Sequence, residues 1–376
     1  MSPTQVFTQS FTDDPWPVLA RLRADGGIHR ILTPDGLPAW LVTRYADVFD
    51  LLLDDRLSTQ PEHARAGEYV GFVLPPELRH HMLNVDSADH AALRRGVTST
   101  LSPKNLVNAD DRLRDVVSRH LAGVDTEGPF DFVREVAVPL PAYVVGEVLG
   151  LPGNVRDALE QWAIEVVAPQ HHGQTRARDT LGLMQQVIGG SLADTSGSPL
   201  AQIIGNVRAD GLGHKHVTAL VFYLLFVWYE VLTDAIGAGL LALFDHNRDL
   251  GSVDELLRHT SPQMLAGPRF ARQDVTVNGV TIGRGECVLL SLASANHDDT
   301  VFPDPERLDF ARTANLAFGH GPHACVGTSI VRSLLTVLFP AVFGAWPDLR
   351  PAMPRERVRW GSGFRHRGPV ELVVRA

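Results

Sequence analysis

The sequence predicts a mainly α-helical protein with small β-sheets. Residues from about 113 to 243 place apolar side chains at helical spacing over long stretches. Short strand-like runs, bounded by turn-forming residues, lie both before and after this region. Of the 376 residues, 44% are hydrophobic, which is enough for a large core. Because no linker, internal repeat or abrupt change in composition divides the chain, we expect residues 1–376 to form a single domain.

The N-terminal elements alternate between helix and strand. Prolines on both sides of Trp16 precede an apolar stripe and predict the start of a helix. Strand-like runs at 28–32 and 39–43 flank a Pro-Asp-Gly turn, and helical spacing returns at 45–53. The longest apolar run, Ala219–Tyr229, is shorter than the ~20 residues that cross a bilayer. We therefore expect this run to be part of a buried core helix.

The C-terminal elements show the same kinds of pattern. Residues 253–259 predict a helix that ends before a proline, and 275–282 alternate around Asn-Gly, which is a strong hairpin signal. Residues 288–295 predict a strand and then a helix. A proline-rich meander comes next at 302–305, and 328–339 predict a long apolar helix.

Charge and cysteine content exclude several classes of function. The net charge of −9 argues against general affinity for nucleic acid. Two cysteines, Cys287 and Cys325, do not make a disulfide scaffold, and a reducing cytoplasm suits them. The polar N-terminus carries no apolar signal core. We expect a soluble cytoplasmic protein that binds neither nucleic acid nor a membrane.

One cysteine lies in a glycine-rich loop, Phe318–Gly327, with a helix-like run after it. Backbone amides from a turn and a helix N-terminus stabilise a thiolate and lower its pKa. The glycines let the backbone approach a large flat group closely. A structural cysteine would not need this glycine spacing. A zinc site made by His320, His323 and Cys325 would lack a second ligand cluster at zinc spacing.

These ten residues match the heme-ligating signature of the cytochrome P450 family, F-x-x-G-x-x-x-C-x-G, and the resemblance extends over nearly the whole chain. The resemblance implies the cytochrome P450 fold and a heme b cofactor. It also implies that Cys325 is the axial iron ligand, with Phe318 and Gly327 as heme contacts in the same loop.

Further family features occur in order along the chain. Glu255 and Arg258 resemble the E-x-x-R pair, which the family completes with an arginine of the meander, matched here by Arg307. The spacing puts both charges on one helix face. Taken singly, such a pair is an ordinary surface ion pair worth under ~1 kcal/mol. By resemblance, its role is to hold the scaffold that supports the cysteine loop.

The resemblance also implies the partners of the heme propionates. His90 and Arg94 lie four residues apart, so both face one side of a helix. Two cationic donors at this spacing suit a carboxylate. The remaining partners implied by the family are Arg269 and His323.

The distal helix departs from the family. Bacterial members read roughly A-G-x-E-T-T where this chain has Val227–Leu232. The acid is kept as Glu230, but Val231 stands in place of the threonine that positions the proton in oxygen activation. Valine has nearly the same shape and no hydroxyl. Trp228 replaces the glycine, where it would shrink the pocket, stack on a planar substrate or donate through its indole N–H. The catalytic candidates are therefore Glu230, Val231 and Trp228.

Three interpretations remain open for this departure. The substrate or an ordered water replaces the hydroxyl, and the protein remains an oxygenase. Alternatively, the protein performs aryl coupling, desaturation, ring formation or peroxide-dependent chemistry. In the third, oxygen activation is lost, leaving a heme-binding scaffold or a non-redox isomerase. The intact cysteine counts against the third, because a scaffold needs no thiolate ligand.

The resemblance implies a heme-thiolate oxidoreductase of secondary metabolism that acts on a small natural product. We expect an aromatic or amino-acid-derived substrate, either free or carrier-bound. Since no reductase domain comes after the cysteine, a separate ferredoxin and its NAD(P)H-dependent reductase are expected to supply electrons. His171 and His172 fall where the family has its substrate lid, and they either contact the substrate or belong to a solvated loop.

Overall fold

The computed structural model describes residues 3–71, 74–102, 104, 109–166, 177–194, 196–361 and 364–376. Its α-helices are α1 (Gln9–Asp13), α2 (Trp16–Ala24), α3 (Tyr45–Leu53), α4 (Ser87–Thr100), α5 (Ala109–Ala122), α6 (Leu140–Leu149), α7 (Gly153–Val166), α8 (Ala177–Ala193), α9 (Pro199–Ala209), α10 (His214–Phe222), α11 (Tyr229–Asp245), α12 (Val253–Thr260), α13 (Leu292–Asn296) and α14 (Thr328–Ala345). Its π-helical turns are η3 (Val133–Ala137) and η4 (Tyr223–Val227), and its 3₁₀ turns are η1 (Pro61–His63), η2 (Pro76–Leu78), η5 (Gly321–His323) and η6 (Arg355–Arg357).

The strands are β1 (Thr4–Gln5), β2 (Ile28–Leu32), β3 (Pro38–Val42), β4 (Leu57–Ser58), β5 (Phe130–Asp131), β6 (Arg269–Ala271), β7 (Val275–Val277), β8 (Val280–Ile282), β9 (Cys287–Leu290), β10 (Arg350–Pro351) and β11 (Val373–Arg375). The predicted class, mainly helical with small sheets near both ends of the chain, is confirmed.

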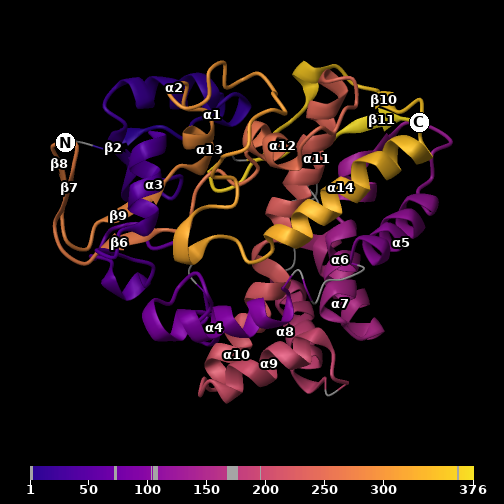
Figure 1. The fold of residues 1–376 in the computed structure, drawn as a ribbon, viewed down its shortest axis with the longest axis horizontal. Coiled ribbons are helices and arrows are strands. Elements are labelled where there is room, and N and C mark those ends of the chain that lie inside the picture. The colour runs from indigo at the N-terminus through magenta and orange to yellow at the C-terminus, as the bar shows by residue number, and fades with distance from the viewer. Residues whose placement is uncertain are drawn as a thin grey trace.

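The largest sheet joins the two ends of the chain. Its order is β1-β2-β3-β9-β6-β4, so N-terminal strands pair with strands that come after the long helical region. β2 and β3 are antiparallel, whereas β3 and β9 are parallel with Trp40 opposite Val288. This sheet lies to one side of the molecule in Figure 1, and the helices α4 to α12 and α14 fill the other side.

A single helical path, His214–Asp245, crosses the helical side as α10, η4 and α11 (Figure 1). Most of α11 is buried, as expected for a core helix. The π-helical turn η4 widens the path halfway along, a feature frequent at functional sites. By length and composition alone, this path and Thr328–Ala345 would suffice to cross a bilayer, although 67% of the most apolar part of the first is buried within the protein.

The local signals in the sequence are confirmed at residue level. β2 and α3 have the predicted bounds, and α14 continues beyond the predicted end. Asn278 and Gly279 join β7 to β8 with φ of 50° and 78°. Two consecutive residues with positive φ are the requirement of a tight hairpin turn that Asn-Gly meets.

The E-x-x-R pair is buried. Arg258 Nε donates to Glu255 Oε2 at 2.6 Å, and neither side chain is exposed to solvent. Arg258 also donates to the carbonyl oxygens of Asn296 and Pro305, at 2.7 and 2.8 Å. One guanidinium thereby joins α12 to the end of α13 and to the meander that leads to the cysteine loop.

The predicted third member of this pair is wrong. The side chain of Arg307 is exposed, and this residue contributes its backbone oxygen to Arg258 at 3.3 Å. Arg312 takes the expected place, with its NH1 3.4 Å from Glu255 Oε1. The meander has no regular structure that would let its side-chain directions be read from spacing, so the motif pointed to the wrong arginine.

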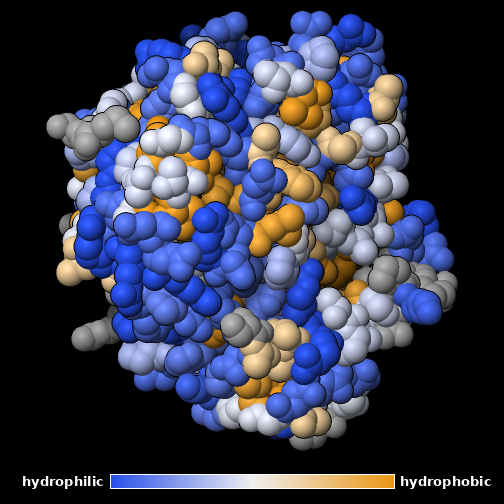
Figure 2. All heavy atoms as spheres, turned by 60° about the vertical axis from the view of Figure 1, so that its left-hand side comes forward, coloured by the Kyte–Doolittle hydropathy of each residue, from blue (hydrophilic) through white to orange (hydrophobic). Residues whose placement is uncertain are grey.

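The surface is mostly polar on the face in Figure 2, where apolar side chains gather only in small patches between hydrophilic residues. This distribution agrees with a chain whose apolar residues are largely committed to the interior.

Replacing Arg258 by Met should lower the free energy of unfolding by about 3–5 kcal/mol, because it leaves the Glu255 carboxylate buried without its cation. Chemical denaturation measures the loss. The matched control is Arg114→Met, which breaks an exposed ion pair with Asp111 at the same helix spacing and should cost under ~1 kcal/mol. Equal losses in the two variants would contradict the assigned role of Arg258.

Candidate active site

The cysteine loop is a rigid turn in front of α14. The Cys325 N–H donates to the Phe318 carbonyl at 2.9 Å, and the Thr328 hydroxyl donates to the Cys325 carbonyl at 2.9 Å. Gly319 and Gly321 have φ of 68° and 74°, which residues with a side chain rarely adopt. The predicted glycine spacing therefore serves the turn itself.

The thiol of Cys325 is accessible and faces the central helical path. Tyr223 of η4 and Arg94 of α4 both lie within electrostatic reach of the sulfur. Although Cys325 is partly accessible to solvent, desolvation by the surrounding protein raises its pKa. Hydrogen bonds from the Gly327 backbone and the Thr328 side chain lower the pKa, as predicted for the loop, but desolvation outweighs them in the protein alone.

The four predicted propionate partners come together beside the loop. The rings of His90 and His323 have centroids 4.0 Å apart. Arg94 donates to the Ala324 carbonyl at 2.8 Å. Burial lowers the pKa of Arg269 to about 10, against the attraction of Asp86, and burial also lowers that of His90. Four basic side chains from distant parts of the chain thus share one buried site.

This basic cluster fits an anionic group. Among the described residues, the buried His90 Nε2 and His323 Nδ1 have no hydrogen-bond partner. The nearby carboxylate is Asp86, 3.9 Å from His323 Nε2. Its oxygens already accept hydrogen bonds from Ser58, Thr59 and Arg272. The carboxylates of a heme would therefore meet donors that the protein itself leaves unpaired.

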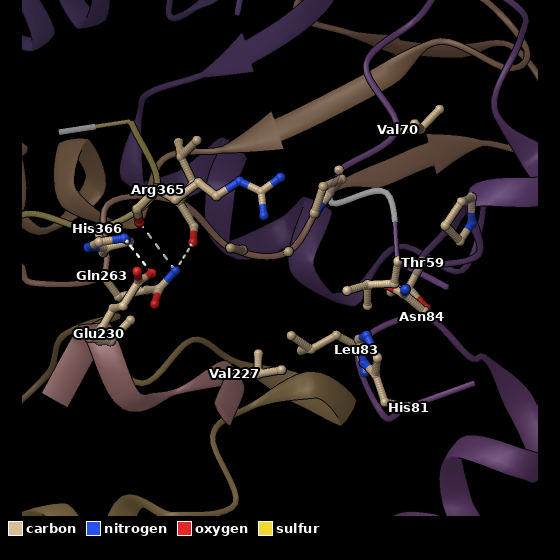
Figure 3. Close-up of a pocket in the computed structure, with 18 of the residues that line it drawn as sticks. Thr59, Val70, His81, Leu83, Asn84, Val227, Glu230, Gln263, Arg365 and His366 are labelled. Atoms are coloured by element: carbon tan, nitrogen blue, oxygen red, sulfur yellow. Dashed lines mark hydrogen bonds and ion pairs between the residues drawn. The ribbon is translucent and has the colours of Figure 1, made fainter. Parts of the chain in front are cut away.

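A cavity of about 330 Å³ lies between the central helical path and the large sheet (Figure 3). Apolar side chains form much of its wall, among them Val227, Val231 and Phe364. Polar side chains lie at two ends. One end carries Glu230, Gln263, Arg365 and His366, and the other carries Thr59, His81 and Asn84.

Glu230 is held by a histidine from the C-terminal part of the chain. His366 Nε2 lies 3.0 Å from Glu230 Oε2, and His366 Nδ1 lies 2.5 Å from Asp234 Oδ2. Burial lowers the pKa of His366, but hydrogen bonds to the two carboxylates outweigh it and raise the pKa to about 10. The hydrogen bond from His366 in turn lowers the pKa of Glu230. We call Glu230, His366 and Asp234 the carboxylate clamp.

The distal candidates do not all reach the cavity. Glu230 and Val231 line it, whereas Trp228 is absent from its lining. The Trp228 indole N–H donates to the Leu224 carbonyl one turn earlier, at 2.7 Å. The expectation that this indole donates to a substrate is therefore wrong, since its one donor is used within the helix.

Other polar side chains of α11 serve the fold. The Thr233 hydroxyl donates to the Tyr229 carbonyl at 3.1 Å, so it does not replace the missing threonine. Tyr229 is fully buried, and its hydroxyl donates to the Val138 carbonyl at 2.8 Å. Tyr229 is therefore part of the core.

Several cavity residues escaped sequence reasoning. His81 lies at one end of the cavity with Nδ1 accepting from the Leu83 N–H, and burial lowers its pKa to about 4. His366 and Asp234 were missed because their meeting depends on the tertiary fold. One signal was available: Glu230 and Asp234 are like charges four apart in a core helix, a destabilising spacing that calls for a cation. His171 and His172 lie outside the described residues.

Comparisons with known proteins agree with this geometry. The cytochrome P450 family model matches residues 251–344. The chain is 33% identical to a vitamin D(3) 25-hydroxylase of Pseudonocardia autotrophica, over 98% of this chain and 95% of that protein. The structure of the tirandamycin C-bound P450 monooxygenase TamI superposes with a TM-score of 0.86 and 29% identity, over 99% of this chain and 100% of that one. The structure of CxnD, a cytochrome P450 enzyme for C–S bond formation in chuangxinmycin biosynthesis, superposes with a TM-score of 0.84 and 25% identity, over 99% of this chain and 97% of that one.

The carboxylate clamp predicts a pH-dependent contribution to stability. The pKa of His366 rises from its ordinary 6.5 to about 10 on folding. Stability from this group is therefore fully present below pH 6.5 and is lost as the pH rises towards 10. His366→Gln should lower the melting temperature most at pH 6 to 7, and the difference from the parent should shrink at alkaline pH.

The control for this prediction is His246→Gln, since the His246 ring bonds to the Ala242 carbonyl at 2.9 Å, roughly three turns beyond Asp234 on the same helical path. If the difference in melting temperature between the His366 variant and the parent stays constant from pH 6 to about 10, no proton is taken up on folding at this site.

Proposed function

This chain belongs to the cytochrome P450 family, and we propose that its Cys325 thiolate holds a heme iron beside a cavity in which a small natural product is oxidised. Relatives more than 30% identical along almost the whole chain establish the family. The observation that carries the assignment of the site is the basic cluster, in which four side chains converge next to the cysteine loop and two buried ring nitrogens, His90 Nε2 and His323 Nδ1, have no hydrogen-bond partner among the described residues.

Members of this family are monooxygenases that bind heme b and act on small molecules with the help of redox partners. The protein is accordingly a heme-dependent oxidoreductase. When bound, the heme supplies dioxygen activation, which an electron-rich thiolate ligand favours.

Each part of the chain has a defined task in this proposal. His90, Arg94, Arg269 and His323 bind the propionates and so fix the orientation of the cofactor. The turn that precedes α14 holds the sulfur of Cys325, and its hydrogen bonds from Gly327 and Thr328 stabilise the charge of a thiolate. With iron bound, Cys325 would give up its thiol proton, and the cost of a free buried thiolate would be removed.

The cavity suits a substrate with an apolar body and polar groups at its ends. Apolar walls exclude water and bury the body, while the end that holds Glu230 and the end that holds His81 offer hydrogen bonds. A cavity of about 330 Å³ accommodates a molecule of ordinary natural-product size. A relative whose structure contains tirandamycin C supports this class of substrate.

Within this class, we favour oxidation in which a proton reaches the cavity from Glu230 without a hydroxyl from its neighbour. Val231 packs against the cavity and can neither donate nor accept a proton. Such a departure is compatible with hydroxylation and also with bond formation between substrate atoms, the reaction named for CxnD. A substrate that is free or carrier-bound, a ferredoxin with its NAD(P)H-dependent reductase, and a cytoplasmic location complete the proposal.

Replacing Arg269 by Met should weaken heme retention by roughly tenfold or more, because a charge-assisted hydrogen bond is lost from the cluster. Heme transfer to an excess of apomyoglobin measures the rate of loss. Arg307→Met, which removes an exposed arginine of the meander, is the matched control and should leave the rate unchanged. Equal rates in both variants would exclude Arg269 as a propionate partner.

The reduced protein with bound carbon monoxide should show the red-shifted Soret band of a thiolate ligand. Cys325→His should keep heme but lose this band, because imidazole donates less electron density than thiolate. Cys287→Ser serves as the control, since Cys287 is buried in β9 away from the cysteine loop. A parent protein that binds heme without the thiolate band would refute the proposed ligation.

A further inference from the structure

In the carboxylate clamp, His366 offsets the repulsion between two carboxylates of the core helix. Glu230 and Asp234 stand one turn apart on α11, and like charges at this spacing repel each other. His366 lies between them, in contact with one carboxylate through each ring nitrogen. A neutral imidazole carries one N–H and would point its second nitrogen lone pair at an oxygen. With both carboxyl groups ionised, this geometry requires the doubly protonated ring.

The backbone is built to hold this histidine against α11. His366 forms an antiparallel bridge with Gln263, and the Arg367 N–H donates to the Pro262 carbonyl at 2.8 Å. A Cβ at Gly368 would come within 2.3 Å of Asp234 Oδ1. A glycine at this position allows the C-terminal loop to approach the carboxylate closely.

His366 is the cationic group that contacts both carboxylates, while the charge of Arg365 also lowers the pKa of Glu230 and the charge of Arg367 acts on Asp234. Glu230 and Asp234 face it from α11. Of its two chain neighbours, Arg365 is bonded to the Tyr69 hydroxyl, and Arg367 stacks on the Trp360 ring at 3.6 Å and donates to a backbone carbonyl at the start of the chain (Asp13). Gln263, which lies beside it, is neutral, and its amide nitrogen donates to two backbone carbonyls (Figure 3).

We propose that His366, oriented by Asp234, supplies through Glu230 the proton that a threonine hydroxyl at position 231 would otherwise position. This inference rests on the proposed oxidation in the cavity. The side chains of Glu230 and His366, 43% and 29% exposed, both line the cavity, whereas that of Asp234 is 14% exposed. The three groups thus form a chain of contacts that runs from Asp234 on α11 through His366 to Glu230 at the cavity wall. His366 acts through Glu230 and is a positioning residue.

The proton balance of this path is simple. The Nε2 proton of His366 passes to Glu230 Oε2, which leaves a neutral imidazole whose Nδ1–H stays bonded to Asp234. The carboxyl group of Glu230 then donates its proton to an oxygen acceptor in the cavity and becomes a carboxylate again. Nε2 regains a proton from bulk solvent, relayed by water that enters when product leaves, so that each cycle consumes one solvent proton through this path. Redox partners supply the electrons, so the clamp itself undergoes no change of oxidation state.

The first test monitors the proton without a substrate. In the reduced, heme-loaded protein with bound carbon monoxide, NMR should find the His366 ring protonated up to about pH 9. Asp234→Asn should move its titration midpoint towards that of an ordinary histidine. The infrared stretch of the bound carbon monoxide should shift with the same midpoint, since it senses Glu230. A ring already neutral at pH 7 in the parent would overturn the proposal.

The second test measures turnover by rescue. With a surrogate ferredoxin and reductase, His366→Gln should slow NADPH consumption by roughly tenfold or more and raise its solvent isotope effect. Adding Val231→Thr to that variant should restore the rate, because the new hydroxyl makes the histidine dispensable. His246→Gln is the control and should match the parent. Asp234→Asn serves as the second variant where His366→Gln does not fold.

The outcomes separate the proton relay from the proposed function. A parent without the thiolate band, or one that consumes no NADPH, contradicts the proposed function, while the NMR titration still decides the state of the clamp. A His366→Gln variant that retains heme and the parental rate overturns the relay alone. A loss of rate that Val231→Thr fails to restore shows a structural role for His366 and also overturns the relay.

Discussion

A single buried guanidinium holds together the segments on which the site depends. Arg258 neutralises Glu255 and satisfies carbonyl oxygens at the end of α13 and in the meander, where no regular hydrogen bonding exists to satisfy them. A buried charge of this kind is tolerable only when every donor has a partner. The meander is therefore ordered by side chains, chiefly Arg258 and Arg312, instead of by a helix or sheet. The cysteine loop comes directly after this meander, so the position of the meander fixes where the loop begins.

The two sides of the site use charge in opposite ways. Beside the cysteine loop, four basic side chains converge and two of their ring nitrogens lack partners, so this side is incomplete without an anion. On α11, one imidazolium contacts two carboxylates, so both of its ring nitrogens have partners within the protein. The first arrangement favours binding a cofactor, and the second favours keeping a proton at a fixed place. Hydrophobic packing around both keeps the local dielectric low and strengthens each effect.

Local signals sufficed for most of the fold, and tertiary geometry decided the rest. Periodicity and turn residues predicted α3, the hairpin around Asn278 and the core helix, because these depend on neighbours in sequence. The cysteine loop and basic cluster were predicted by family resemblance. The role of Arg312 in place of Arg307 depended on an irregular meander, which has no periodic signal. The direction of Trp228 depended on a π-helical turn, which has none either. The contact of His366 with Asp234 could not be predicted from local patterns, because 132 residues separate the two.

The wide turn η4 has a consequence for how such a site diversifies. A π-helical turn accommodates one extra residue, which rotates the helix before the turn by about 100° relative to the helix after it. Side chains of α10 and η4 can thus exchange places on the cavity wall through gain or loss of a single residue, while Glu230 and the clamp on α11 keep their orientation. Selection on substrate shape and selection on proton supply would then act on separate halves of one helix, leaving an evolving lineage free to change the first without disturbing the second.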